Sequence, residues 1–139
     1  MLKDKYTVKL EKPTANNFIY LRSKIGWGDL DKNLANKSLE QSLFHVTVYD
    51  SATLIAMGRV VGDGAMYFYI QDVVVDPQYQ KQGIGSLIML EIEGYLTSTA
   101  QKGATIGLLS AKGKEGFYSK YHYLLRPSDS LGHGMCRFV

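Results

Sequence analysis

The amino-acid sequence predicts an α+β fold of the three-layer α/β type, in which helices cover both faces of a mixed, mainly antiparallel central sheet. Two observations favour this class. Three β-rich stretches follow one another through short turns over residues 43–75, which is typical of an antiparallel meander. A strand pattern, a long helical pattern and another strand pattern then occur in succession, which indicates one parallel pair joined by a right-handed crossover.

Before the meander, residues 6–10 alternate as a short strand would. A helix is expected next, because apolar residues recur at spacings of three and four. These residues are Phe18, Leu21 and Ile25. A second, polar helix is expected over residues 31–42, with Leu34 and Leu39 facing inward.

The meander itself is predicted over residues 43–50, 54–61 and 66–75. The end of its third strand, residues 70–75, is rich in β-branched side chains, as a strand covered on both faces would be. Pro77 follows directly after Asp76 and ends the strand.

The rest of the chain predicts four further elements. The longest helical pattern covers residues 83–99, and a short apolar strand follows over 105–109. A short helix is expected over 115–121, followed by strands near 123–126 and 135–139.

Length and composition limit the class of protein. The chain has 139 residues, of which 45% are hydrophobic and 21% charged, so a single folded domain spanning residues 1–139 is expected. The net charge of +3 is too small to indicate nucleic acid, although it suits an anionic small molecule. The sequence predicts no signal peptide and no membrane-spanning run. Cys136 is the only cysteine, and we expect it to be a small buried residue of a cytoplasmic protein.

The most informative stretch is residues 73–86, where a polar loop with two glycines, Gly83 and Gly85, opens the long helix. Backbone N–H groups without partners at a helix N-terminus form a cradle for phosphate or diphosphate. The alternative is a helix that merely starts with glycines. Ile88 stands where a dinucleotide-binding fingerprint needs its third glycine, and the chain has no Gly-Lys-Ser/Thr tripeptide, so a phosphate cradle here is of another type.

Residues 80–85, Gln-Lys-Gln-Gly-Ile-Gly, resemble the Gln/Arg-x-x-Gly-x-Gly/Ala signature of the GNAT superfamily of N-acetyltransferases. Further along, Leu-Leu-Ser-Ala at 108–111 and Phe-Tyr-Ser-Lys-Tyr at 117–121 are similar to the late strand and the Phe-Tyr-x-Lys helix of that family. His122 stands where the family usually has a glycine in a left-handed turn, and histidine tolerates that conformation comparatively well.

The resemblance implies a GNAT-like acyl-CoA N-acyltransferase fold and acetyl-CoA as the co-substrate. The loop would hold the diphosphate through its N–H groups, and the preceding strand would bond the pantetheine arm. In the family a bulge in that strand frees an N–H that polarises the acetyl carbonyl, here at about Val73. The residues expected to contact the coenzyme are Val73, Val74, Val75, Gln80, Lys81, Gln82, Gly83, Ile84, Gly85 and Ser86.

Two side chains are candidates for catalysis. Tyr118 matches the position at which the family commonly carries its general acid, and an ordinary tyrosine stays protonated beside a departing thiolate. The alternative is that Tyr118, one of ten tyrosines, only packs. Asp72 is the one carboxylate just before the expected bulge, and it would accept a proton or bind the substrate ammonium. A carboxylate held by backbone groups or by an arginine is the alternative.

Arg22, Trp27 and Arg59 are the candidates for the acceptor pocket. Arg59 lies in the middle of a predicted strand, where a guanidinium suits the carboxylate of an amino acid or a similar zwitterion. An ion pair of Arg59 with Asp72 or Asp63 explains the same position equally well.

The sequence therefore predicts an N-acetyltransferase that moves acetyl from acetyl-CoA to a primary amine of a small molecule, with amino acids among the candidates, by direct attack in a ternary complex. The alternatives are acetylation of a protein lysine or N-terminus, and a non-catalytic acyl-CoA-binding sensor. No metal is expected, because the three histidines lack ligand spacing. Neither nucleic acid nor membrane is an expected partner, and a homodimer stays open, as do the acceptor and the general base.

Overall fold

The computed structural model describes all residues from 1 to 139. The chain divides into two compact units, residues 1–106 and 107–139, which are described separately.

A five-stranded sheet in the order β1-β2-β3-β4-β5 is the centre of the N-terminal unit. The first four strands pair antiparallel with their neighbours. At the start of β5, the N–H of Thr105 donates to the carbonyl of Met66 over 2.7 Å. The strands are β1 (Thr7–Lys9), β2 (Phe44–Asp50), β3 (Thr53–Gly62), β4 (Tyr67–Val75) and β5 (Thr105–Leu108). The predicted class, a mixed, mainly antiparallel sheet flanked by helices, is confirmed.

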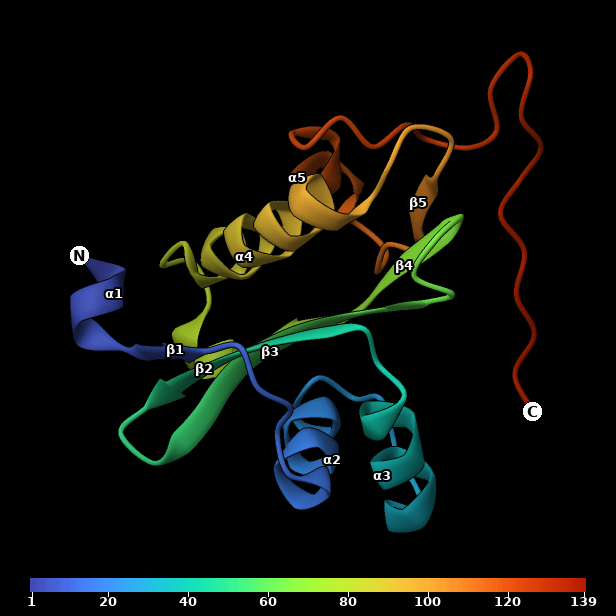
Figure 1. The fold of residues 1–139 in the computed structure, drawn as a ribbon. Coiled ribbons are helices and arrows are strands. Elements are labelled where there is room, and N and C mark those ends of the chain that lie inside the picture. Colours follow the sequence, from blue (N-terminus) through green and yellow to red (C-terminus); the bar gives the residue numbers. More distant parts are fainter. The chain divides into compact units, whose positions relative to one another are not determined.

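Helices lie on both faces of this sheet (Figure 1). Helices α2 (Ala15–Lys24) and α3 (Lys32–Glu40) lie on one face, and α4 (Ile84–Thr99) lies on the other. Side-chain caps fix where the first two begin, since Thr14 accepts the N–H of Asn17 and Asp31 accepts the N–H of Leu34. Two short helices were not predicted: α1 (Leu2–Lys5) and the 3₁₀ turn η1 (Pro77–Tyr79).

Of the two residues of α3 that were expected to face inward, Leu39 does and Leu34 does not. Leu34 was expected to face inward, yet its side chain is 58% exposed, whereas Ala35 and Leu39 are buried. Ala35 and Leu39 are four residues apart and so share a helix face, and the small Ala35 was passed over in favour of its larger neighbour.

Close packing of α4 on the sheet depends on Gly58, in the middle of β3. A Cβ at this position would lie 2.7 Å from Cγ2 of Ile88 and 3.0 Å from Cδ1 of Ile92. Ile88 and Ile92 are fully buried. The missing side chain therefore lets the helix approach the strand directly.

The C-terminal unit contains the end of β5 and the short helix α5 (Glu115–Ser119). The strands expected over 123–126 and 135–139 do not form. Pro127 and the Ser, Asp and Gly residues at 128–134 interrupt any continuous apolar face, so neither stretch has one to bury. Their large apolar side chains are exposed, namely Leu124, Leu125, Met135 and Phe138. Cys136 is exposed as well, contrary to expectation.

Replacing Gly58 with alanine should lower the free energy of unfolding by about 1–3 kcal/mol, because the added methyl overpacks the contact with Ile88. Urea unfolding measures this change. Gly94→Ala is the matched control in α4, where a Cβ would meet nothing within 4 Å, and it should stabilise the fold by about 0.5–1 kcal/mol. Equal effects of the two variants would contradict the packing role of Gly58.

Candidate active site

A β-bulge interrupts β4 at the point where the sequence analysis expected one. Met57 pairs with Val74, and Arg59 pairs with Gln71, so Asp72 and Val73 together face the single residue Gly58. Asp72 adopts a φ of 54°, in the left-handed region. Aspartate is one of the few side chains that tolerate this conformation, and a bulge of this kind leaves a residue outside the ladder of hydrogen bonds. The strand therefore offers backbone polar groups at Asp72 and Val73 for another partner.

The side chain of Asp72 fixes the bulge to two other elements. It is buried, and its Oδ2 accepts a hydrogen bond from Nε of Arg59 over 2.9 Å. Its Oδ1 accepts from Nη1 of Arg22 and, at 3.4 Å, from the amide of Gln71. Arg59 belongs to β3 and Arg22 to α2. These three residues, Arg22, Asp72 and Arg59, form what we call the Asp72 cluster.

Arg59 uses its Nε and Nη1 for contacts within the protein. Its side chain is only 10% exposed, and its Nη1 donates to the carbonyl of Ser38, to Oγ of Ser38 and to Oγ of Ser42 over 2.9–3.1 Å. Arg59 thus links β3 to the end of α3 as well as to the bulge. This geometry agrees with the ion-pair interpretation of Arg59 rather than with a role in the acceptor pocket.

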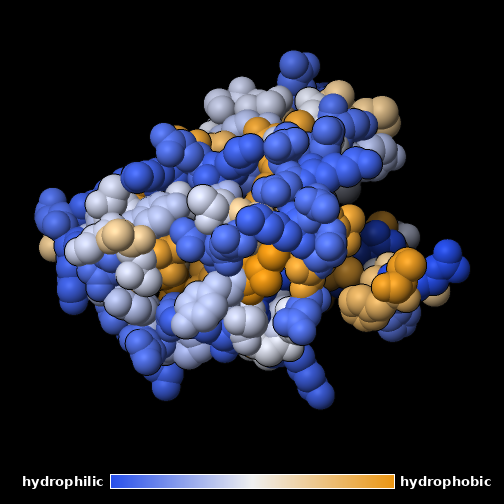
Figure 2. Space-filling view, turned by 90° about the horizontal axis from the view of Figure 1, so that it is seen from below, coloured by the Kyte–Doolittle hydropathy of each residue, from blue (hydrophilic) through white to orange (hydrophobic).

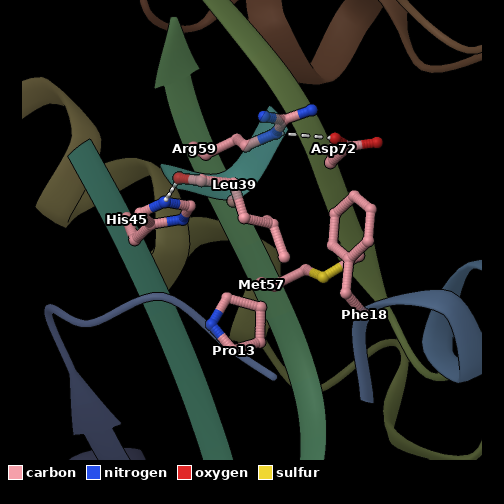
Figure 3. A pocket seen from close by; sticks show the side chains of 8 residues that line it. Pro13, Phe18, Leu39, His45, Met57, Arg59 and Asp72 are labelled. Atoms are coloured by element: carbon pink, nitrogen blue, oxygen red, sulfur yellow. Dashed lines mark hydrogen bonds and ion pairs between the residues drawn. The ribbon is translucent and has the colours of Figure 1, made fainter. Parts of the chain in front are cut away.

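The space beside Arg59 is too narrow to admit a water molecule. Figure 3 shows its walls, with the ring of Phe18 and the side chain of Met57 below the Arg59–Asp72 pair. His45 closes another side and donates from Nε2 to the carbonyl of Leu39 over 2.9 Å. Burial lowers the pKa of His45, which favours the neutral ring. The residues around this pocket pack against the Asp72 cluster and leave no room for a substrate.

Arg22 contacts two aromatic rings. Its Cζ lies 5.4 Å from the ring centre of Phe18 and 4.9 Å from that of Trp27, distances typical of cation–π contacts. Phe18 also lies 5.5 Å from Cζ of Arg59. The Nε of Arg22 is buried and has no hydrogen-bond partner.

Trp27 is reachable from outside. The face seen in Figure 2 is mainly hydrophilic and is broken by smaller hydrophobic areas. The large side chains that remain exposed on α2, α3 and the loop between them are Tyr20, Trp27 and Leu34.

The loop after β4 forms an open helix N-terminus. Gly83, with a φ of 88°, is the N-cap of α4, and no side chain caps the helix. Lys81 is also left-handed, with a φ of 63°. Of the loop residues at 80–86 only Ile84 is buried, and it anchors the first turn in the core. The first backbone N–H groups of α4 therefore combine exposure, lack of a cap and the positive end of the helix dipole.

Side chains on the core side of the loop fix its course. The Gln80 amide donates to the carbonyl of Val75 over 3.1 Å, and Tyr6 donates to Gln82 over 2.9 Å. Asp76 is buried, accepts the N–H of Gln78 and pairs with Lys24 at 2.6 Å. The hydrogen bond that Lys24 donates to Asp76 raises the pKa of Lys24, which keeps the ammonium charged.

Tyr118 belongs to α5 in the C-terminal unit. Its ring meets the ring of Phe117 edge-on, with 5.1 Å between the centres. Burial raises the pKa of Tyr118 above its ordinary value, so the hydroxyl is protonated at neutral pH. His122, after this helix, has a φ of 70°, the left-handed conformation that the family's glycine would adopt.

Sequence reasoning missed three contributors to this site: Phe18 as a platform for the arginines, and Ser38 and Ser42 as acceptors for Arg59. None of them is part of a local motif. One further signal was available, because an isolated glycine inside a strand pattern, here Gly58, often marks a bulge or a close approach.

No group of histidine, cysteine, aspartate or glutamate side chains is arranged to hold a metal ion. None of the helices combines the length and the apolar character needed to span a bilayer.

Comparison with curated proteins finds relatives that are named as N-acetyltransferases. The chain is 28% identical over 135 residues to an N-acetyltransferase ycf52-like protein of Prochlorococcus marinus, a match that covers 91% of this chain and 73% of that protein. It is 34% identical over 79 residues to the chloroplastic GCN5-related N-acetyltransferase 1 of Arabidopsis thaliana, covering 56% of this chain and 39% of the relative.

Among solved structures, SA2161 from methicillin-resistant Staphylococcus aureus, which its description groups with the acetyltransferases, is 33% identical with a TM-score of 0.88. The match covers 96% of this chain and 99% of that one. A GNAT-family acetyltransferase, SP0256 of Streptococcus pneumoniae, is 25% identical with a TM-score of 0.74, covering 96% and 98% of the two chains. The family model described as "Acetyltransferase (GNAT) domain" matches residues 40–123. The chain belongs to the GNAT family of acetyltransferases.

Proposed function

We propose that this GNAT acetyltransferase moves acetyl from acetyl-CoA directly to a primary amine of a small molecule. The observation that carries the proposal is the continuity of residues 72–86. The bulge of β4 and the uncapped start of α4 are the two ends of this one segment. A thioester carbonyl and a diphosphate are the two features of acetyl-CoA that need backbone N–H donors.

The loop residues fit a diphosphate. A left-handed Gly83 turns the chain so that successive N–H groups follow one another around the helix start, and no side-chain oxygen competes for them. In this proposal, residues 80–86 hold the diphosphate, and the backbone of Val73, Val74 and Val75 bonds the pantetheine arm as an added strand would.

Acetyl-CoA supplies the acetyl group as a thioester. The bulge N–H, at about Val73, donates a hydrogen bond to the carbonyl oxygen as the amine nitrogen attacks the carbonyl carbon. The carbon–sulfur bond breaks, and the Tyr118 hydroxyl gives its proton to the departing sulfur. The substrate ammonium loses one proton to water before the attack. As the amide forms, its nitrogen loses a second proton, which passes through water to the Tyr118 oxygen and restores the hydroxyl.

Asp72 acts in this proposal as a positioning residue. Both of its oxygens already accept hydrogen bonds from arginines, so neither is free to take a proton from the amine. Its side chain instead holds the left-handed backbone of the bulge in place, and thereby the N–H beside it.

Gly83→Val should abolish binding of CoA, because a β-branched residue is strained at a φ of 88° and would shift the backbone N–H groups at the start of α4. Calorimetric titration of CoA measures the loss. Gly103→Val is the matched control, since Gly103 has a φ of 100° and lies outside the loop. Tight binding of CoA by the Gly83 variant would contradict the cradle.

Tyr118→Phe should lower kcat roughly tenfold or more, which corresponds to about 1.4 kcal/mol, and leave the affinity for CoA nearly unchanged. Release of free thiol from acetyl-CoA follows the rate. Because burial raises the pKa of Tyr118, the acid stays protonated, and loss of native activity at alkaline pH should begin only above the ordinary pKa of a tyrosine. Tyr121→Phe, three residues further on, serves as the control. A native kcat in the Tyr118 variant would show that Tyr118 is not the general acid.

Asp72→Asn should lower kcat at least tenfold while the shape of the rate–pH profile stays the same. Asparagine tolerates the left-handed φ of residue 72 but cannot pair with both arginines, so the bulge loses its anchor. Disappearance of the acidic limb of the profile would show instead that Asp72 is the general base.

A panel of amines, assayed for free thiol in the presence of acetyl-CoA, tests the function as a whole. Turnover of at least one small amine is expected. Binding of CoA without turnover of any amine would support a sensor, and turnover of peptides alone would support a protein substrate.

A further inference from the structure

Arg22 carries a buried donor that nothing in the molecule satisfies. Its Nη1 donates to Asp72, but its Nε is buried without a hydrogen-bond partner. A buried donor left unpaired costs about 1–3 kcal/mol, and more for a charged group. Such a group in a native fold calls for an explanation, and a ligand that supplies the acceptor is one.

The geometry of guanidinium identifies the kind of acceptor. The Nε–H and one Nη2–H point in the same direction from one edge of the planar group, and Nη1 lies on the other side. A carboxylate binds such an edge with two parallel hydrogen bonds. Asp72 uses Nη1 and therefore leaves the edge that contains Nε to another carboxylate.

The charge of the surroundings favours a single negative charge. The Asp72 cluster contains two guanidinium groups and one carboxylate, so it carries one excess positive charge. The neighbouring pair of Lys24 and Asp76 is neutral. A carboxylate monoanion would neutralise the cluster, whereas a phosphate dianion would leave it with an excess of negative charge in a half-buried place.

Trp27 provides a way in. It covers Arg22 from a loop in which both neighbours, Gly26 and Gly28, are left-handed, with φ of 81° and 74°. A Cβ on either glycine would meet no atom within 4 Å, so the chain around Trp27 is not enclosed. Trp27 as a residue is 38% exposed, and a ligand reaches the Nε edge of Arg22 once the Trp27 ring moves off the guanidinium.

We propose that the Nε edge of Arg22 binds the carboxylate of the acceptor, so that the substrates are amines bearing a carboxylate, as amino acids do. In an α-amino acid the amine is two bonds from the carboxylate carbon. Because Arg22 touches Asp72, a carboxylate on Arg22 holds that amine beside the bulge. This inference rests on the proposed function. It assigns Arg22 and Trp27 to the acceptor site, whereas Arg59 stabilises the bulge through Asp72.

Binding can be measured without catalysis, because Trp27 is the only tryptophan of the chain and its fluorescence reports on this site alone. The probes are N-acetylated amino acids, beginning with N-acetylglycine, each compared with its uncharged amide at constant ionic strength. We expect a saturable change with the acids and none with the amides. No saturable change with any acid, or equal changes with acid and amide, would overturn the proposal.

Two further arms test the residue and the anion. Arg22→Lys keeps a charge for Asp72 but lacks the Nε edge, and it should weaken binding of the acid roughly ten- to hundredfold. Tyr20→Ala, which removes an exposed ring from the same helix, should bind as the native protein does. Unchanged binding by the Arg22 variant, or tighter binding of inorganic phosphate than of the acids, would contradict the carboxylate assignment.

The activity assay separates this inference from the proposed function. In the native protein, we expect kcat/KM for amino acids to exceed that for their amides by roughly ten- to hundredfold. If acids bind at Trp27 but no amine is acetylated, the acetyltransferase proposal fails and the site stands. If amines with and without a carboxylate react equally well, the proposed function stands and this inference fails.

Discussion

One carboxylate between two guanidinium groups determines how the N-terminal unit is arranged around β4. Asp72 is buried, and a buried charge is tolerated only when it is paired and hydrogen-bonded. Its partners come from α2 and β3, and Arg59 extends the contact to Ser38 at the end of α3. The same residue adopts the left-handed backbone of the bulge. The ion pairs that stabilise the packing of α2 and α3 on the sheet therefore also fix the backbone at the proposed reaction centre.

The sequence patterns correctly predicted those elements whose formation depends mainly on interactions between residues close in the chain. The meander, the long helix and the loop before it follow from alternation, helical spacing and glycines, and each formed within a few residues of its expected bounds. Of the two α3 residues expected to face inward, Leu39 is buried, but Leu34 is exposed and Ala35 is buried in its place. The strands expected after residue 122 were wrong, since short apolar stretches become strands only when a partner strand and a buried face exist.

The candidate site also contains residues that the sequence indicated and contacts that only the folded structure reveals. Gly83 and Tyr118 were proposed because they belong to short motifs with fixed spacing, and Asp72 because it is the one carboxylate just before the expected bulge. The role of Arg59 stayed open between substrate and ion pair, and only the fold brings it to Asp72, Ser38 and Ser42. The contacts of Arg22 with Phe18 and Trp27 join three residues of one segment, yet no sequence pattern indicates that Nε of Arg22 lacks a partner.

The proposed function depends most on binding of the donor's diphosphate at the uncapped start of α4. Calorimetric titration of the native protein with CoA, and separately with pantetheine, which has the same thiol arm but no diphosphate, tests it directly. A clear binding heat is expected with CoA, together with an affinity for pantetheine that is weaker by orders of magnitude. Equal affinities for the two, or no binding of CoA by folded protein, would contradict it.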